Sequence, residues 1–293
     1  MTQPPDDLRS TFLPCPEGRL HVYSAGDHGS PVLLLSGAGV DNALLSWRHL
    51  IPVLAQRHQV LALDWPKQGR SHPWSGRATH ERMLGCVTEV LDRFGLDSAT
   101  LVGLSQGGAL ALAYAIDHPE RVERLVALAP AGILSFPPGV HQLLWLTAKL
   151  PLLNRTLPTA AFRSRARIAE FARRALFAGP VWDFDDVVDE IAEEVGEAGG
   201  GSSDWQNASI GPLRMRVDLR PRLPEITTPT LLIQGDKDIG VHPERTRAAA
   251  ALIPGCRLEV LAGVGHWSSR QTPDRVNRLI TDFLAMDGVD PLG

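Results

Sequence analysis

Short runs of apolar residues alternate with segments of helical periodicity along most of the chain. Six runs, rich in valine, leucine and isoleucine, have the near-continuous hydrophobicity of strands that are covered on both faces of a sheet. They are residues 32–36, 59–64, 99–104, 124–129, 230–234 and 257–261. Ahead of them, residues 10–15 and 19–24 flank the turn-forming Pro16-Glu17-Gly18 and predict an antiparallel hairpin. This alternation predicts an α/β fold with a mainly parallel central sheet flanked by helices.

Several of the intervening helices carry start and stop signals. Thr79 precedes an apolar-periodic stretch, residues 83–94, that stops at Gly95. Threonine is a preferred N-cap, and glycine commonly follows the last turn of a helix. Thr272 and Pro273 open the last helix, since proline is favoured at the first helical position.

The alternation breaks between about Gly132 and Arg220, where no strand pattern appears. We therefore expect a core formed by residues 1–131 and 221–293, with a helical cap inserted as residues 132–220. Within the insert, residues 163–174 hold five Arg and one Glu, while residues 183–197 hold eight acidic residues and no basic one. Adjacent blocks of opposite charge favour complementary or solvated helix faces over a nucleic-acid site.

Charge and composition narrow the classes of function. The 293 residues include 29 Lys and Arg against 33 Asp and Glu, a formal net charge of -4, which argues against broad binding of nucleic acid or an anionic membrane. The three cysteines form no CxxC pair and suit reduced thiols. The start of the chain lacks the pattern of a secretory signal, and no apolar run approaches the roughly 20 residues of a membrane span. We expect a cytoplasmic protein that acts on a small molecule without membrane contact; a homodimer is compatible with these features.

The sharpest local motif is Gly103-Leu104-Ser105-Gln106-Gly107, a GxSxG. Alone it is a weak signal, but it directly follows a predicted strand, 99–104, and opens a predicted helix, 106–117. A serine in such a tight turn projects its hydroxyl away from the backbone, and neighbouring chain segments pass close only where side chains are missing at the flanking glycines. The context predicts Ser105 as a nucleophile.

A serine nucleophile needs a base and an acid that orients the base. His266 lies in the loop after the strand 257–261, and the carboxyl ends of parallel strands are where such sheets place their sites. For the acid, Asp238 and Asp236 both follow the strand 230–234; we favour Asp238, which lies further into the loop. Asp64 also ends a strand but is typical of a solvated turn. The predicted catalytic residues are Ser105, Asp238 and His266.

The oxyanion formed during acyl transfer needs preorganised N–H donors. The backbone N–H of Gln106, directly after the nucleophile, is one candidate. The other is in the loop Ser36–Gly39 after the first buried strand, with Ala38 the favoured donor.

These residues together resemble the α/β-hydrolase fold superfamily, over about residues 10 to 285. The resemblance rests on the elbow at Gly103–Gly107, the GxxD loop at Gly235–Asp238, Gly265-His266, and residues 64–71, which look like the family's DxxGxGxS turn. The insert falls where the family places a helical cap. One departure is Ser36-Gly37, where the family usually has His-Gly, so the hydrogen bonding of this loop must differ.

The resemblance implies a serine hydrolase, and the favoured activity is cleavage of a carboxylic ester or lactone. Ser105 excludes the aspartate nucleophile of haloalkane dehalogenases and epoxide hydrolases. A carbon–carbon bond hydrolase acting on vinylogous diketones is an alternative, because Gly265-His266-Trp267 resembles the GHW of those enzymes, although their GNSMGG and GxGPG motifs match poorly. A perhydrolase of the non-haem haloperoxidase type and a non-catalytic binding protein are further alternatives.

The remaining site predictions concern substrate, metal and cofactor. Aromatic residues of the cap and of the histidine loop are candidates for contact with an apolar substrate: Trp145, Trp182 and Trp267. His80-Glu81 begins like an HExxH motif but lacks the second histidine, so no metal is expected. The glycines form no dinucleotide-binding GxGxxG, and no cofactor is expected.

Overall fold

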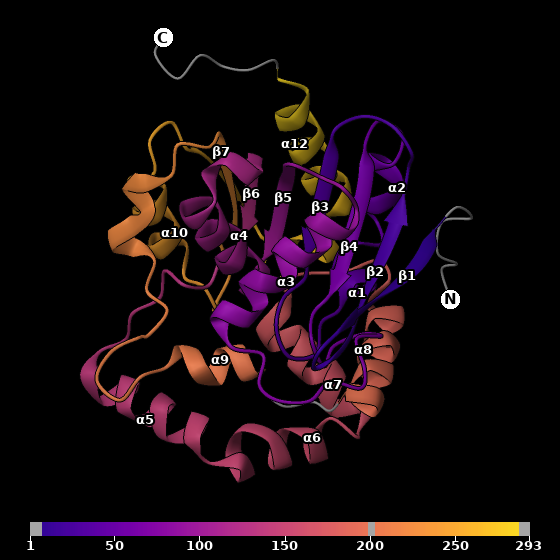
Figure 1. Cartoon of the computed structure of the whole chain (residues 1–293). Helices are drawn as coiled ribbons and strands as arrows, with labels where there is room; N and C mark the ends of the chain where they lie inside the picture. Colours follow the sequence, from indigo (N-terminus) through magenta and orange to yellow (C-terminus); the bar gives the residue numbers. More distant parts are fainter. Residues whose placement is uncertain (1–7, 199–202, 287–293) are drawn as a thin grey trace.

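A computed structural model describes residues 8–198 and 203–286, and an eight-stranded sheet forms its centre (Figure 1). The strand order is β1-β2-β4-β3-β5-β6-β7-β8. β1 (Arg9–Cys15) pairs antiparallel with β2 (Gly18–Ala25), and β2 pairs antiparallel with β4 (Gln59–Asp64). All other neighbours are parallel: β3 (Pro31–Leu35), β5 (Ala99–Leu104), β6 (Val122–Leu128), β7 (Thr230–Gly235) and β8 (Arg257–Leu261). Each predicted strand is present within two residues, so the mainly parallel α/β fold is confirmed.

Helices cover both faces of the sheet. One face packs against α3 (His80–Arg93), α4 (Gln106–Asp117) and α10 (Pro243–Ala250), and the other against α1 (Ala43–Trp47), α2 (Ile51–Leu54) and α12 (Pro273–Ala285). Alternate residues of β3 point to opposite faces, with Leu33 and Leu35 in the first cluster and Val32 and Leu34 in the second. Because both faces are covered, the strands show no polar alternation.

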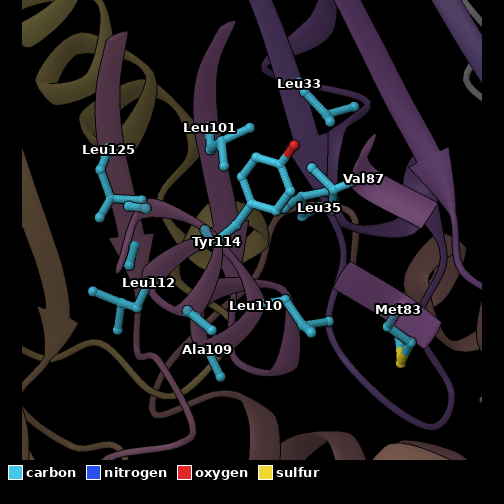
Figure 2. Close-up of a cluster of buried hydrophobic side chains, with 14 of the residues drawn as sticks. Leu33, Leu35, Met83, Val87, Leu101, Ala109, Leu110, Leu112, Tyr114 and Leu125 are labelled. Carbon is cyan, nitrogen blue, oxygen red and sulfur yellow. The ribbon is translucent and has the colours of Figure 1, made fainter. Parts of the chain in front are cut away.

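The helix that follows the predicted nucleophile is anchored in the core. Tyr114 of α4 lies among Leu33, Leu35 and Leu101, as Figure 2 shows. The Tyr114 hydroxyl, which would be costly to bury unpaired, makes a hydrogen bond of 3.1 Å with the hydroxyl of Thr88 on α3. The packing of Tyr114 therefore fixes α4 against the sheet and against α3.

The helices inserted between β6 and β7 follow the short η1 (Pro119–Arg121) and β6, and they are α5 (Pro138–Lys149), η2 (Leu152–Thr156), α6 (Leu157–Ala161), α7 (Arg165–Phe171), η3 (Ala172–Leu176), α8 (Phe184–Ala198), α9 (Asp204–Ser209) and η4 (Arg220–Glu225). Of these, α5, α6, α7, α8 and α9 gather below the sheet in Figure 1, at one end of its strands. Leu219 and Leu223 already belong to the core cluster, so the end of the insert packs as part of the core.

The charged blocks of the insert form two kinds of contact. Arg165 of α7 pairs with Asp185 and Asp189 of α8, at 3.0 and 2.6 Å. Other acidic residues of this segment bind the core instead: the buried Arg270 in α11 (Ser268–Gln271) pairs with Asp183 at 2.6 Å and with Glu190 at 3.1 Å. These ion pairs fasten the inserted helices to the loop region after β8.

Candidate active site

Ser105 occupies a strained turn between β5 and α4, with φ 53° and ψ −109°. A Cβ atom on Gly103 would lie 2.3 Å from the carbonyl oxygen of Gly107, and one on Gly107 would lie 2.2 Å from the carbonyl oxygen of Leu35 in β3. Both flanking positions thus require glycine because backbone atoms occupy the space of any side chain. Strained backbone of this kind is frequent at active sites, so the turn is consistent with the prediction of Ser105 as the nucleophile.

Replacing Gly107 by alanine is expected to destabilise the protein by about 3 kcal/mol or more, since the added methyl group must displace the backbone of β3. The measurement is the free energy of unfolding in guanidinium chloride. Gly196 of α8 provides a matched control, because a Cβ there meets nothing within 4 Å. Gly196→Ala should be neutral or stabilising by roughly 0.5 to 1 kcal/mol. Equal effects of the two substitutions would contradict the packing described for the turn.

His266 and Asp238 form a hydrogen-bonded pair in the loops after β8 and β7. The distance from Nδ1 of His266 to Oδ2 of Asp238 is 2.7 Å. Oδ1 of Asp238 accepts hydrogen bonds from the N–H groups of Gly240 (2.7 Å) and Val241 (2.9 Å), and Gln234 donates to Oδ2. Burial alone would raise the pKa of Asp238, but the hydrogen bond and charge of His266, together with the backbone donors, hold it below its usual range. The carboxylate therefore stays ionised and holds the Nδ1 edge of the imidazole ring in place.

The runner-up acid, Asp236, has another role. Its Oδ1 accepts hydrogen bonds from the N–H groups of Gly263, at 2.7 Å, and Val264, at 3.4 Å. These contacts join the loop after β7 to the loop after β8. Asp236 therefore braces the backbone near the histidine, whereas Asp238 contacts the histidine ring.

Ser105 and His266 are not hydrogen-bonded to each other in the described part of the chain. The side chain of His266 is 16% exposed, and its Nδ1 is engaged by Asp238, so Nε2 is the nitrogen left to face a nucleophile. Hydrogen bonds between catalytic groups are often long before substrate binds and tighten in the complex. His266 as the base that acts on Ser105 therefore stays a prediction.

Two backbone N–H groups beside Ser105 are unpaired among residues 8–198 and 203–286. One belongs to Gln106, the first residue of α4, where helix geometry leaves the N–H without a partner. The other belongs to Ala38, whose N–H makes no hydrogen bond with any described residue. The preceding Gly37 N–H, by contrast, is donated to Oδ2 of Asp41 at 2.6 Å. A Cβ on Gly37 would lie 3.7 Å from Cβ of Ser105, so this loop contacts the turn that carries the serine. Ala38 and Gln106 thus have free donors in the region where sequence reasoning expected an oxyanion hole.

The loop Ser36–Gly39 is held by side chains from outside the loop. The indole N–H of Trp65 donates to the carbonyl of Ser36 at 2.9 Å, and Gln68 donates to the carbonyls of Gly37 and Gly39 at 3.3 and 3.4 Å. Asp41 binds the same loop through the Gly37 N–H and is itself held by the hydroxyl of Ser46 at 2.6 Å. The geometry of the two donors therefore depends on Trp65, Gln68 and Asp41.

Segments of the insert reach both sides of the candidate site. The hydroxyl of Ser203 donates to Oε1 of Gln106 at 2.6 Å, while Nε2 of the same buried amide has no partner within the described residues. On the histidine side, a Cβ on Gly265 would lie 2.7 Å from the carbonyl oxygen of Leu176 in η3. Gln271 accepts hydrogen bonds from the N–H groups of Gly265 and Ala178, at 2.9 and 3.2 Å. The inserted helices are thus fastened next to the residues expected to act in catalysis.

The three tryptophans predicted to bind substrate lie in different environments. Trp145, on α5, is half-buried, and its indole N–H is buried without a hydrogen-bond partner among the described residues. Trp267 is buried, stacks on Phe177 with ring centroids 6.1 Å apart and donates to the hydroxyl of Ser46. Trp182 is 67% exposed and lies beside His49 in an outer groove of about 600 Å³. Of the three, Trp145 combines partial exposure with an unpaired buried donor among the described residues, and its contact with substrate stays a prediction.

Asp64 differs from its expected place in a solvated turn. It is buried, and its carboxylate accepts hydrogen bonds from the N–H groups of Ala43 (2.9 Å) and Arg70 (3.0 Å) and lies 2.8 Å from Nδ1 of His21. Asp64 is the last residue of β4, and it is covered because β2 pairs with β4 and places His21 opposite Asp64. The sequence interpretation missed this pairing, which joins residues 43 positions apart.

Two buried carboxyls near the Ser36–Gly39 loop have raised pKa values. Burial raises the pKa of Asp41 to about 7, with hydrogen bonds from Ser46, Gly37 and Asn42 offsetting only part of the effect. Burial, followed by the charges of Asp64 and Asp41, raises the pKa of Glu194 on α8 to about 7, although Asn42 and Gly69 donate hydrogen bonds to it. Glu194 therefore joins the insert to the loop beside the candidate oxyanion hole.

The free energy of unfolding should fall as pH rises from 5 to 8 because of these carboxyls. A carboxyl whose pKa is raised on folding contributes stability that is full below its unfolded pKa, near 4, and is lost as pH passes the folded value of about 7. The decrease in the free energy of unfolding between pH 5 and pH 8 should be smaller in Glu194→Gln than in the wild type, by on the order of 2 kcal/mol. Denaturant unfolding at the two pH values measures it. The exposed Glu193 is the control, and Glu193→Gln should leave the slope unchanged. A wild-type slope in Glu194→Gln would contradict the burial effect.

Residues 8–198 and 203–286 contain no group of three or more His, Cys, Asp or Glu side chains placed to hold a metal ion. Over the same ranges, none of the helices combines the length and apolar composition that a bilayer crossing requires.

Comparisons with known proteins agree with the fold described above. Residues 30–271 match the family model described as the alpha/beta hydrolase fold. The chain is 29% identical to the 2-hydroxymuconate semialdehyde hydrolase of Pseudomonas sp. (strain CF600), over 91% of this chain and 90% of that protein. It is 26% identical to the carboxylesterase YbfK of Bacillus subtilis (strain 168), over 91% of this chain and 84% of that protein. The crystal structure of the enol-lactonase from Burkholderia xenovorans LB400 superposes with a TM-score of 0.74 and 22% identity, covering 94% of this chain and all of that one.

Proposed function

The chain belongs to the α/β-hydrolase fold family, and on that premise we propose that it is a serine hydrolase that cleaves a carboxylic ester or lactone through an acyl-enzyme. The pairing of His266 with Asp238, at 2.7 Å, together with the strained turn of Ser105, is the observation that carries this proposal. The known relatives are hydrolases of more than one kind, so the family alone leaves the bond that is cleaved open.

In the proposed reaction, Nε2 of His266 accepts the proton of the Ser105 hydroxyl as the serine oxygen attacks the substrate carbonyl carbon. Asp238 accepts the hydrogen bond from Nδ1–H, which fixes the tautomer and stabilises the imidazolium. The N–H groups of Ala38 and Gln106 hold the oxyanion of the tetrahedral intermediate. His266 then returns the proton to the leaving alkoxide, and the acyl-enzyme forms. Water, activated by His266, hydrolyses it.

We propose a substrate of small to medium size that is largely apolar and carries an uncharged ester or lactone group. The buried amide Nε2 of Gln106 and the buried indole N–H of Trp145 are both unpaired in the described ranges, and both are neutral donors. Neutral donors suit uncharged oxygens such as those of an ester or lactone, since they supply hydrogen bonds without a charge that needs compensation. Trp145 and Gln106 are therefore proposed to contact substrate.

A second candidate is hydrolysis of a carbon–carbon bond. The similarity to the 2-hydroxymuconate semialdehyde hydrolase, and the Gly265-His266-Trp267 sequence, favour it. The loop Ser36–Gly39 and the elbow Gly103–Gly107 favour the ester or lactone reaction, because neither matches the motifs expected of carbon–carbon hydrolases.

A panel of substrates distinguishes the two reactions. It contains p-nitrophenyl esters of increasing acyl length, lactones and vinylogous diketones, each assayed for kcat/KM. We expect the largest kcat/KM on an ester or lactone. A larger value on a vinylogous diketone would replace the proposed activity with the second candidate, and absence of turnover on all three classes would contradict both.

A further inference from the structure

The outer edge of the insert carries an exposed apolar stripe. We define the outer arm as residues 138–161, which comprise α5, η2 and α6 and form the lower rim of the molecule in Figure 1. Within it, exposed leucines recur at intervals of three and four residues, at 143, 146, 150, 153 and 157. Leu143 and Leu157 are 62% and 51% exposed, and Val140 and Leu152 extend the same surface. On α5, this spacing places Leu143 and Leu146 on the same side. Leu150, whose backbone is extended, ends α5, and the other leucines continue the exposed surface on η2 and α6.

The stripe faces away from the rest of the protein. On α5, the opposite side carries His141, which is buried and makes a hydrogen bond of 2.8 Å with the carbonyl of Gly211. Trp145, one turn further, points its buried indole N–H to the same side. Leu143 and Leu146 lie roughly half a helical turn away from these residues. The exposed leucines are thus neither part of the core nor part of the candidate active site.

The charge around the stripe is of one sign. Residues 124–169 contain no Asp or Glu, while Lys149, Arg155, Arg163, Arg165 and Arg167 lie within or just after the outer arm. Arg165 pairs with Asp185 and Asp189. The other four cations are exposed and form no salt bridge with any residue that the structure describes. The net charge of -4 therefore conceals a locally basic, apolar surface.

We propose that the outer arm binds the surface of an anionic phospholipid bilayer, lying in the plane of the interface. An apolar stripe flanked by lysine and arginine is complementary to such a surface, because the leucines enter the acyl boundary while the cations contact the headgroups. A second copy of the chain is a poorer occupant. A twofold interface sets the same patch against itself, so it would bring two sets of unpaired cations together. The proposal reverses the expectation of no membrane contact that the net charge suggested, and it does not depend on the activity proposed above.

Cosedimentation with unilamellar vesicles tests the proposal. The vesicles contain either phosphatidylcholine alone or equal parts of phosphatidylcholine and phosphatidylglycerol. We expect the full-length protein to partition onto the mixed vesicles at least about tenfold more strongly than onto the neutral ones, with binding that weakens as salt is added. The double variants Leu150→Asp/Leu157→Asp and Lys149→Glu/Arg155→Glu should each lose about tenfold or more of this binding.

Leu252 is the matched control, since it is an exposed leucine, at 43%, that lies outside the outer arm. Leu252→Asp should bind the mixed vesicles as the wild type does, and an unchanged unfolding midpoint for every variant would show that each remains folded. Equal binding to both kinds of vesicle, or wild-type binding by the outer-arm variants, would overturn the proposal. So would a dimer in sedimentation velocity that Leu150→Asp/Leu157→Asp converts to monomer in the absence of any vesicle binding, because the stripe would then be an interface between two copies.

Discussion

Replacing Ser105 by alanine is expected to lower kcat/KM by about 10⁴-fold or more on any substrate that the protein turns over. The reason is that Ser105 supplies the oxygen that forms the acyl-enzyme, and the N–H groups beside it accelerate attack by water only weakly without that oxygen. The measurement is kcat/KM of purified wild-type and variant protein on the best substrate of the panel.

The control for this substitution lies at the other end of β5. Ser98 directly precedes β5, at the end opposite Ser105, and its hydroxyl donates a hydrogen bond of 2.7 Å to the exposed Glu123. Ser98→Ala should retain wild-type kcat/KM within about twofold, as surface substitutions usually have small effects. Activity of Ser105→Ala within tenfold of the wild type, in protein with a normal unfolding transition, would rule out Ser105 as the nucleophile.

The second large effect is expected from Asp238. Asp238→Asn removes the negative charge that stabilises the imidazolium, and its amide can hold the wrong tautomer of His266. We expect kcat to fall by about 10³- to 10⁴-fold with a much smaller change in KM. Assays should be made at several pH values, because the lowered pKa of Asp238 keeps its carboxylate ionised across the neutral range.

Asp236 makes this prediction specific. It is two residues away on the same loop, but it binds the N–H groups of Gly263 and Val264 and not the histidine ring. Asp236→Asn keeps an acceptor oxygen for those donors, so its kcat should fall by less than about tenfold. A larger loss of kcat in Asp236→Asn than in Asp238→Asn would show that Asp236, and not Asp238, is the acid that orients His266.

The sheet was predictable from the sequence because its strands are covered on both faces. Their apolar runs are nearly continuous, and each appears in the structure within two residues of its predicted position. Short helices gave no such signal. α1, α2 and α11 have five, four and four residues, which is too short for a hydrophobic period to repeat.

The candidate site was predictable where chemistry and backbone geometry coincide in a short motif. Gly103 and Gly107, two residues to either side of Ser105, are required because backbone atoms fill the space of a side chain there. Both glycines lie within the five-residue motif, so the sequence alone reveals this requirement. Glu194 carries no comparable signal, since its partner Asn42 is 152 residues away and only the docking of α8 brings them together. Asp41 and Gln68 are similar cases. Their part in holding the Ser36–Gly39 loop follows from the closed fold and not from any spacing.

Covalent labelling with a fluorophosphonate tests the central claim most directly, because the reagent forms a stable bond only with an activated serine. Trypsin should release Ser105 in the peptide spanning residues 94–121, which also contains Ser98. We predict that fragmentation by mass spectrometry places the phosphonyl group on Ser105, and that Asp238→Asn slows the labelling. Labelling at Ser98 or in another peptide, or the absence of labelling in protein that hydrolyses a substrate, would contradict the account.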